Sequence, residues 1–170
     1  MKKLKVDFDD IAFVMEKQND MGSSEHFDTE TGEVLNIPDE VMDAAESGDV
    51  EEIASLPDWE QELIETAKLI LADEKGRFQD IPRRSSSDGY ELMAEFAESV
   101  GNAKLRTRLE SALHGKGVFR RFKDALRDDP DEEKRWYKFH DEKMRQEVRD
   151  WLNSLDIEPV EVYRKMKKAD

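Results

Sequence analysis

The residues best suited to chemistry lie in one short block, Gly115–Asp124, inside a basic stretch of the chain. Residues 104–127 contain eight Lys or Arg and only two acids, in a protein whose formal net charge is −15. A local excess of positive charge attracts anions. These residue types define no reaction, so the block predicts where function lies and not which function it is. The candidates for contact with an anion or a partner are Gly115, Lys116, Gly117, Arg120, Arg121, Lys123 and Arg127.

The segment Gly115-Lys116-Gly117 has the composition of a phosphate-binding loop but not its spacing. A Walker motif that used this lysine would need glycine at position 110 and serine or threonine at 117, where the chain has Glu110 and Gly117. Free N–H groups at the start of a helix from Val118 could still hold an anion beside Lys116. The simpler interpretation, which we favour, is that Gly115 ends one helix in the left-handed conformation and Gly117 begins the next.

Residues 118–127 have the spacing of an amphipathic helix. Its apolar side carries Val118, Phe119, Phe122, Ala125 and Leu126. We expect these side chains to lie in the core, and we do not expect the aromatic rings to stack on nucleic-acid bases. The opposite side, here called the basic ridge and predicted to be exposed, carries Arg120, Lys123 and Arg127. Asp124 lies four residues after Arg120 and three before Arg127, so it neutralises part of this charge.

A second segment, Phe27–Gly32, resembles the first motif of the DEDD-type exonucleases. In that motif an aspartate and a glutamate two residues apart hold two metal ions. The preceding residues Ser23–His26 do not read as a core strand, and no histidine precedes an aspartate at the required spacing. Asp28 and Gly32 are also ordinary turn residues. We therefore predict a solvent-facing hairpin turn that binds no metal pair.

The composition indicates a folded protein with no cofactor or metal site. The chain has 170 residues, 37% of them hydrophobic and 41% charged, and it contains no cysteine. Disulfides, thiolate catalysis and cysteine-bound metals are thereby excluded, and the three histidines form no ligand pair. Asp7, Asp9 and Asp10 interrupt the place where a signal peptide would be apolar, and no segment approaches the roughly 20 apolar residues of a membrane span. We expect a cytoplasmic protein without membrane contact.

Charge is distributed unevenly between the two parts of the chain. Residues 1–100 hold 9 Lys or Arg and 27 Asp or Glu, whereas residues 101–170 hold 18 and 15. The acidic part either imitates DNA or is an ordinary solvated surface, and the second interpretation is favoured. The anionic partner of the basic ridge is a protein or a nucleic acid, and a protein is favoured because the acidic part would repel nucleic acid.

The first half of the chain is expected to hold three helices and a small sheet. Asp7 caps the first helix, Pro38 opens the second and Pro57-Asp58 starts a stronger one that ends at Gly76. The apolar stripe of that third helix consists of Trp59, Leu63, Ala67, Ile70 and Leu71. Residues 25–28 and 33–37 form a hairpin, to which 77–81 can add a third strand.

Segments 32–38 and 76–82 have glycine, an apolar residue, isoleucine and proline at the same relative positions. Two strands that each end in an Ile-Pro step explain this better than a repeated unit, because the residue before proline favours extended geometry.

The second half is expected to be helical. Residues 83–89 form a Ser-rich loop that supplies helix caps, and helices around 90–100 and 102–113 pack as a hairpin. Asp129-Pro130 begins a long final helix that reaches about residue 155. We predict an α+β protein, predominantly helical, with five to seven helices and a small antiparallel hairpin near residues 24–37. Residues 1–156 form a single compact domain with an N-terminal helix, and 157–170 form a C-terminal tail or a docked strand.

The chain also resembles the uncharacterised bacterial protein family UPF0158. The resemblance spans roughly Phe27 to Leu155 and is strongest in GKGVFRRFKD, residues 115–124. The other segments that carry it are FDTETGE at 27–33, Ile81-Pro82 with YELM at 90–93, WYKF at 136–139 and Trp151-Leu152. It implies a small cytoplasmic bacterial protein of unassigned activity, with no catalytic residues to carry over.

Two hypotheses of function follow from the sequence. The first is a non-enzymatic interaction protein whose basic ridge contacts an anionic partner. The second is an enzyme acting on a phosphorylated or anionic small molecule, with Lys116, Arg120 and Arg121 as charge clamps. An enzyme requires a concave pocket beside residues 115–121 with converging titratable groups, whereas a binding module requires a flat or convex ridge.

Overall fold

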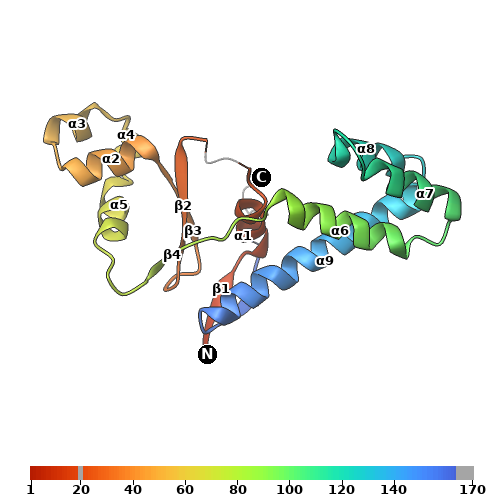
Figure 1. Cartoon of the computed structure of the whole chain (residues 1–170). Coiled ribbons are helices and arrows are strands. Elements are labelled where there is room, and N and C mark those ends of the chain that lie inside the picture. The colour runs from red at the N-terminus through yellow and green to blue at the C-terminus, as the bar shows by residue number, and fades with distance from the viewer. Residues whose placement is uncertain (19–20, 164–170) are drawn as a thin grey trace. The chain divides into compact units, whose positions relative to one another are not determined.

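The computed structural model describes residues 1–18 and 21–163, which form helices and short strands (Figure 1). Their contacts group into two compact units, where the sequence predicts one domain over residues 1–156. Unit 1 comprises residues 1–83 and the C-terminal residues from Trp151 onward, and unit 2 comprises residues 84–150. The division follows the apolar residues, which form separate clusters in each part of the chain.

Unit 1 contains all five strands described and most of the short helices. Its elements are β1 (Lys2–Val6), α1 (Phe8–Met15), β2 (Ser23–Asp28), β3 (Val34–Pro38), α2 (Asp39–Ser47), α3 (Val50–Ser55), α4 (Asp58–Gln61), α5 (Ile64–Leu71), β4 (Phe78–Asp80) and β5 (Ile157–Glu161). Unit 2 holds α6 (Ser86–Ser99), α7 (Ala103–Ala112), α8 (Val118–Leu126) and most of α9 (Pro130–Ser154). The predominantly helical α+β class is confirmed, with more helices than predicted because residues 50–61 add the two short helices α3 and α4.

A three-stranded antiparallel sheet of order β3-β2-β4 confirms the predicted hairpin and its third strand. The two segments with shared glycine and isoleucine positions lie on opposite sides of β2, and each contributes a buried isoleucine, Ile37 and Ile81. Gly32 and Gly76, which precede β3 and β4, both have left-handed backbone angles, φ 78° and 79°.

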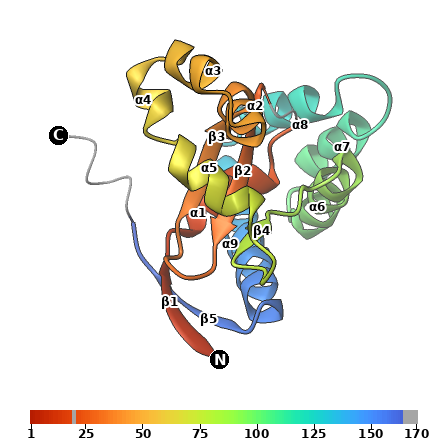
Figure 2. The ribbon, with the colours of Figure 1, turned by 90° about the vertical axis from the view of Figure 1, so that its left-hand side faces the viewer.

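The first and last strands pair with each other, which the sequence did not indicate for β1. β1 and β5 run parallel, with Lys2 opposite Ile157 and Val6 opposite Glu161 (Figure 2). Residues 157–161 therefore form the docked strand, one of the two alternatives for this segment. Residues 164–170 lie outside the described part of the chain.

The helix predicted from Pro57 to Gly76 is wrong in its continuity, because the chain breaks between α4 and α5. Its predicted stripe is partly right: Ala67 is buried and Leu63 and Ile70 pack against the same cluster, whereas Trp59 and Leu71 are exposed and the buried residues missed are Glu60 and Ile64. Trp59 is 59% exposed. The buried face contacts α2, where Val41 and Ala44 complete the apolar cluster and Glu40 supplies a partner for the carboxyl group of Glu60.

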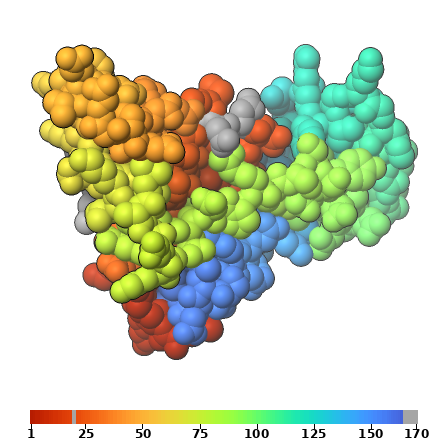
Figure 3. Space-filling view, turned by 60° about the vertical axis from the view of Figure 1, so that its left-hand side comes forward, coloured from red at the N-terminus to blue at the C-terminus, as the bar shows by residue number. Residues whose placement is uncertain are grey.

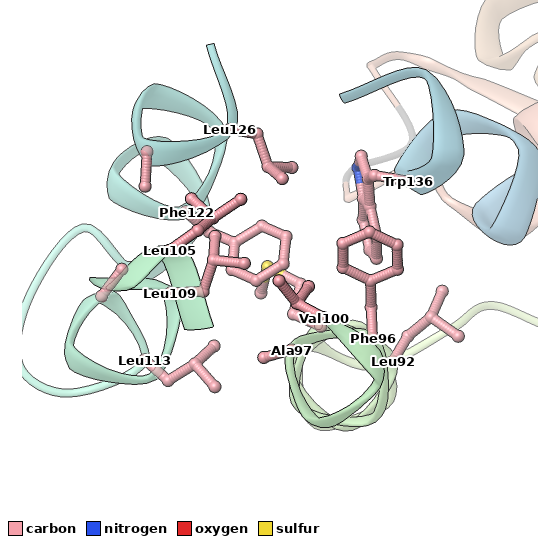
Figure 4. Packing of buried hydrophobic residues seen from close by; sticks show 13 residues of the cluster. Leu92, Phe96, Ala97, Val100, Leu105, Leu109, Leu113, Phe122, Leu126 and Trp136 are labelled. Atoms are coloured by element: carbon pink, nitrogen blue, oxygen red, sulfur yellow. The ribbon is translucent and has the colours of Figure 1, made fainter. Parts of the chain in front are cut away.

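Unit 2 has a core built from four helices (Figure 4). Phe96 of α6, Phe122 of α8 and Trp136 of α9 meet edge to face, with ring centroids 5.1–6.4 Å apart. The caps agree with the sequence: Ser85 forms a capping box with Asp88, and the Asp129 carboxylate accepts from the N–H of residue 132. In the described residues no helix is both long and apolar enough to cross a bilayer.

Candidate functional site

The basic ridge occupies the exposed side of α8. Arg120, Lys123 and Arg127 are all exposed, as predicted, and the Arg120 side chain is 89% exposed. On the opposite side Phe122 and Leu126 are fully buried in the core of unit 2. Figure 3 shows the part of the chain that holds α7 and α8, in green to teal, at the surface of the molecule. The amphipathic pattern therefore orients the ridge, because the core fixes the rotation of the helix.

Asp124 neutralises part of the ridge. Its carboxylate accepts a hydrogen bond from Arg127 at 3.1 Å, while Arg120 Nε is 4.0 Å away. Lys116 and Lys123 have no ion pair or side-chain hydrogen bond with any other described residue. Arg120, Lys123 and Lys116 thus provide most of the charge that remains available to a partner.

Arg121 has a different environment from the other candidates. Its guanidinium donates to the carbonyl oxygens of Ala112, at 2.9 Å, and His114. These carbonyls end α7, where unpaired acceptors and the helix dipole favour a cation. Both hydrogen bonds come from Nη2, and they make Arg121 a brace between α7 and α8.

Gly115 and Gly117 shape the turn between α7 and α8. Both have left-handed backbone angles, φ 85° and 68°, and Gly117 is the residue that caps α8. Gly117 therefore begins α8 as the favoured interpretation has it, whereas α7 already ends at Ala112 with Leu113 as its C-cap, two residues before Gly115. No side chain caps the first turn of α8, so the N–H groups that follow Gly117 stay open to an anion.

Phe119 corrects one expectation of the sequence, which placed its ring in the core with Phe122. The ring is 48% exposed and lies over Gly89 of α6, where a built Cβ atom would approach it to 3.0 Å. It helps to line a groove of about 450 Å³ between the first turns of α6 and α8. The groove is lined by Ser86, Ser87, Tyr90, Glu91, Val118 and Phe119.

In the segment that resembles the exonuclease motif, the carboxylate of Asp28 forms an ion pair with Arg77. Arg77 donates from Nε to Asp28 Oδ1 at 3.0 Å and from Nη2 to Oδ2 at 2.9 Å. Burial opposes ionisation of Asp28, but the hydrogen bonds from Arg77 and from the N–H of Glu30 prevail and lower its pKa. Asp28 and Gly32 are buried, so the prediction of a solvent-facing turn is wrong for these two positions. Among the described residues no group of three or more histidine or acidic side chains could hold a metal ion.

One arrangement in the sheet has the residue types of a catalytic triad. Ser24 Oγ lies 2.9 Å from His26 Nε2, and His26 Nδ1 lies 3.8 Å from Asp80 Oδ1. The second distance exceeds a hydrogen bond, and the Asp80 side chain is almost fully exposed, so Asp80 does not orient the imidazole as a triad requires. Burial lowers the pKa of His26 against the attraction of Asp80 and Glu25. The sequence signal was the i,i+2 spacing on a strand, which places Ser24 and His26 on one face.

A pair of carboxyl groups, Glu40 and Glu60, joins α2 to α4. Burial raises the pKa of Glu60, and a hydrogen bond with Glu40 and the charge of Glu40 raise it further. The pKa of Glu40 is lowered by its own backbone N–H and by the hydrogen bond with Glu60. The folded state therefore holds a proton on Glu60 at a pH where the unfolded chain has released it.

We expect Glu60→Gln to reduce the loss of stability that accompanies rising pH. Because the pKa of Glu60 is raised in the folded state, its contribution is present below its unfolded value near 4.5 and is lost as pH rises through the folded value. Glutamine keeps a donor for Glu40 without this loss. Urea unfolding at pH 5 and pH 7.5 should show the variant gaining on the wild type at the higher pH. The control is Glu62→Gln, which removes the same charge at an exposed position. An equal gain in stability at pH 7.5 for this control would contradict the prediction.

Comparison with known proteins places the chain in a family. The model of the uncharacterised protein family UPF0158 matches residues 39–166, which include the basic ridge and leave out the segment Phe27–Gly32. A UPF0158 protein of Pseudomonas aeruginosa is 28% identical over 160 residues, which cover 94% of this chain and 89% of that protein. No solved structure matches the chain. The chain therefore belongs to the uncharacterised protein family UPF0158.

Proposed function

We propose that this protein is a non-enzymatic interaction protein and that its basic ridge, together with Lys116, contacts an anionic partner. The observation that carries the proposal is the division of α8 into two sides. Phe122 and Leu126 hold the helix in the core, and the cations on the other side are exposed without contributing to that packing. Exposed charges contribute little to stability, so a partner is the use that this surface offers.

A protein partner fits the ridge better than nucleic acid does. Nucleic acid carries one negative charge per nucleotide, and a chain of net charge −15 repels such a polymer. An acidic patch on a protein brings fewer charges and can place them on the ridge alone. The enzyme alternative gains no comparable support, because an enzyme requires converging titratable groups and the groove beside α8 has only Glu91 and Tyr90 as titratable residues of its lining. Cytoplasmic location stays a prediction from the sequence.

The double variant Arg120→Glu and Lys123→Glu tests the proposal. We expect the fold and the urea midpoint to stay close to the wild type, because both side chains are exposed. Affinity capture from a lysate of the source cells, quantified by mass spectrometry, should lose at least one partner by about tenfold or more. The same partner should be captured less by the wild type as salt rises from about 50 to about 300 mM.

The matched control is Lys2→Glu with Lys3→Glu, which makes the same change of charge on exposed positions of β1. It should retain the partner that the ridge variant loses. Retention of every partner by the ridge variant at both salt concentrations would mean that the ridge is only a solvated surface.

A further inference from the structure

The groove beside the ridge exposes two aromatic rings on a small surface. Tyr90 of α6 is 38% exposed and Phe119 of α8 is 48% exposed, and both line the groove. Soluble proteins seldom leave large apolar side chains grouped at the surface unless the group serves an interaction. Tyrosine and phenylalanine are also enriched at the centres of protein interfaces, since each buries a large area with little loss of conformational freedom.

Gly89 leaves room for the Phe119 ring on α6. This glycine lies in the first turns of α6, where alanine would favour the helix. Any Cβ atom at this position would lie 3.0 and 3.4 Å from two carbons of the ring. The absence of a side chain therefore lets Phe119 lie directly on α6. Phe119 packs on α6 in this way while it stays 48% exposed, and its ring forms one wall of the groove.

The charges around the groove select the kind of occupant. Lys116 lies two residues before Val118 in the sequence, and Arg120 directly follows Phe119; both cations are exposed, and neither belongs to the lining of the groove. The first turn of α8 has no side-chain cap, which adds a partial positive charge at the same end of the helix. Glu91 is the one acid in the lining, and it belongs to α6. Acidic groups of an occupant are therefore repelled on the α6 side of the groove and favoured on the α8 side.

We infer that the groove binds an apolar side chain of an acidic peptide segment, whose carboxylates pair with Lys116 and the basic ridge. The inference rests on the proposed function and names the partner of that surface. A volume of about 450 Å³ accommodates a leucine or an aromatic side chain together with part of its backbone. The hydroxyl groups of Ser86 and Ser87 lie in the lining and can donate to carbonyl groups of the peptide.

Single-stranded nucleic acid is the rival occupant, because bases stack on exposed aromatic rings beside cations. Glu91 in the lining and the net charge of −15 disfavour a phosphate at every position along the groove. A peptide avoids this repulsion because its charges need not be regularly spaced.

The experiment begins with selection of a displayed library of random 12-residue peptides on the full chain. We expect the enriched peptides to share one large apolar residue flanked by Asp or Glu. One enriched peptide, labelled with fluorescein, is then titrated with the wild type and with three variants. Phe119→Ala and the ridge variant Arg120→Glu, Lys123→Glu should each weaken binding about tenfold or more. Tyr137→Ala, which removes an equally exposed aromatic ring outside the groove, should leave the affinity within about twofold.

The outcomes separate this inference from the proposed function. Loss of binding in the ridge variant but not in Phe119→Ala would leave the proposed function standing and overturn the groove as its site. Binding that neither variant weakens would overturn both, and failure to enrich acidic peptides would overturn the choice of partner. A 12-nucleotide oligothymidine that binds more tightly than the peptide, and loses affinity in Phe119→Ala, would assign the groove to nucleic acid instead. Circular dichroism of each variant distinguishes lost binding from lost fold.

Discussion

Replacement of Phe122 by alanine is expected to lower the free energy of unfolding by about 3–5 kcal/mol. The ring has no exposed surface and meets Trp136 at 5.1 Å and Phe96 at 6.4 Å between ring centroids, both edge to face. Alanine would leave a cavity in a close-packed core and remove both aromatic contacts. Urea unfolding, followed by tryptophan fluorescence, measures the change.

The matched control lies three residues earlier on the same helix. Phe119→Ala removes an identical group from a position that is 48% exposed, so we expect a loss below about 1 kcal/mol. A small loss for Phe122→Ala, or equal losses for the two variants, would show that the core does not depend on this side of α8. The orientation of the basic ridge would then lack its structural basis.

The helices of unit 2 could be predicted closely because local residues determine their ends. Asp129-Pro130 starts α9 and Asn102 starts α7, as their capping preferences require. Gly48 ends α2 in the left-handed conformation in the same way. In each case the side chain or backbone that fixes the boundary lies within a few residues of it.

The elements that the sequence missed depend on partners far away in the chain. β1 forms because residues 2–6 pair with residues 157–161. The alternation of Lys3, Leu4, Lys5 and Val6 is a local signal for a strand, but it does not identify the distant partner. The buried carboxyl group of Glu60 in α4 has a hydrogen bond with Glu40, an exposed residue of α2 that lies 20 positions earlier in the chain. A helical wheel drawn from apolar residues cannot place a carboxyl group in a core, so it selected Trp59 instead.

The candidate site shows the same division. Helical periodicity alone correctly predicted that Arg120 and Lys123 are exposed and that Phe122 is buried, because they lie on the polar and the apolar side of α8. Phe119 lies at the border of the apolar side, where burial depends on the neighbouring helix and Gly89 leaves the ring partly open. The capping role of Arg121 and the groove itself require the turn after α7 and the start of α6, and the sequence places neither relative to α8.

Gly32→Ala is expected to destabilise the protein by about 3–5 kcal/mol, from two causes that add. Alanine at φ 78° incurs the strain of the left-handed conformation, about 1–2 kcal/mol. Its Cβ atom would also lie 2.1 Å from the carbonyl oxygen of Lys5, which belongs to the backbone of β1 and cannot rotate away. Relief requires the hairpin and β1 to separate, at a further cost of about 2–3 kcal/mol that is typical of overpacking.

Gly22→Ala separates the two causes. Gly22 has nearly the same backbone angle, φ 77°, and a Cβ atom there would meet nothing within 4 Å. The free energy of unfolding of Gly22→Ala should therefore fall only by the cost of the left-handed conformation, about 1–2 kcal/mol, measured in the same urea titration. The difference between the two variants measures the contact of the hairpin with β1. Equal losses would contradict that contact, and with it the buried position of Asp28 and Gly32 that distinguishes this turn from a metal-binding motif.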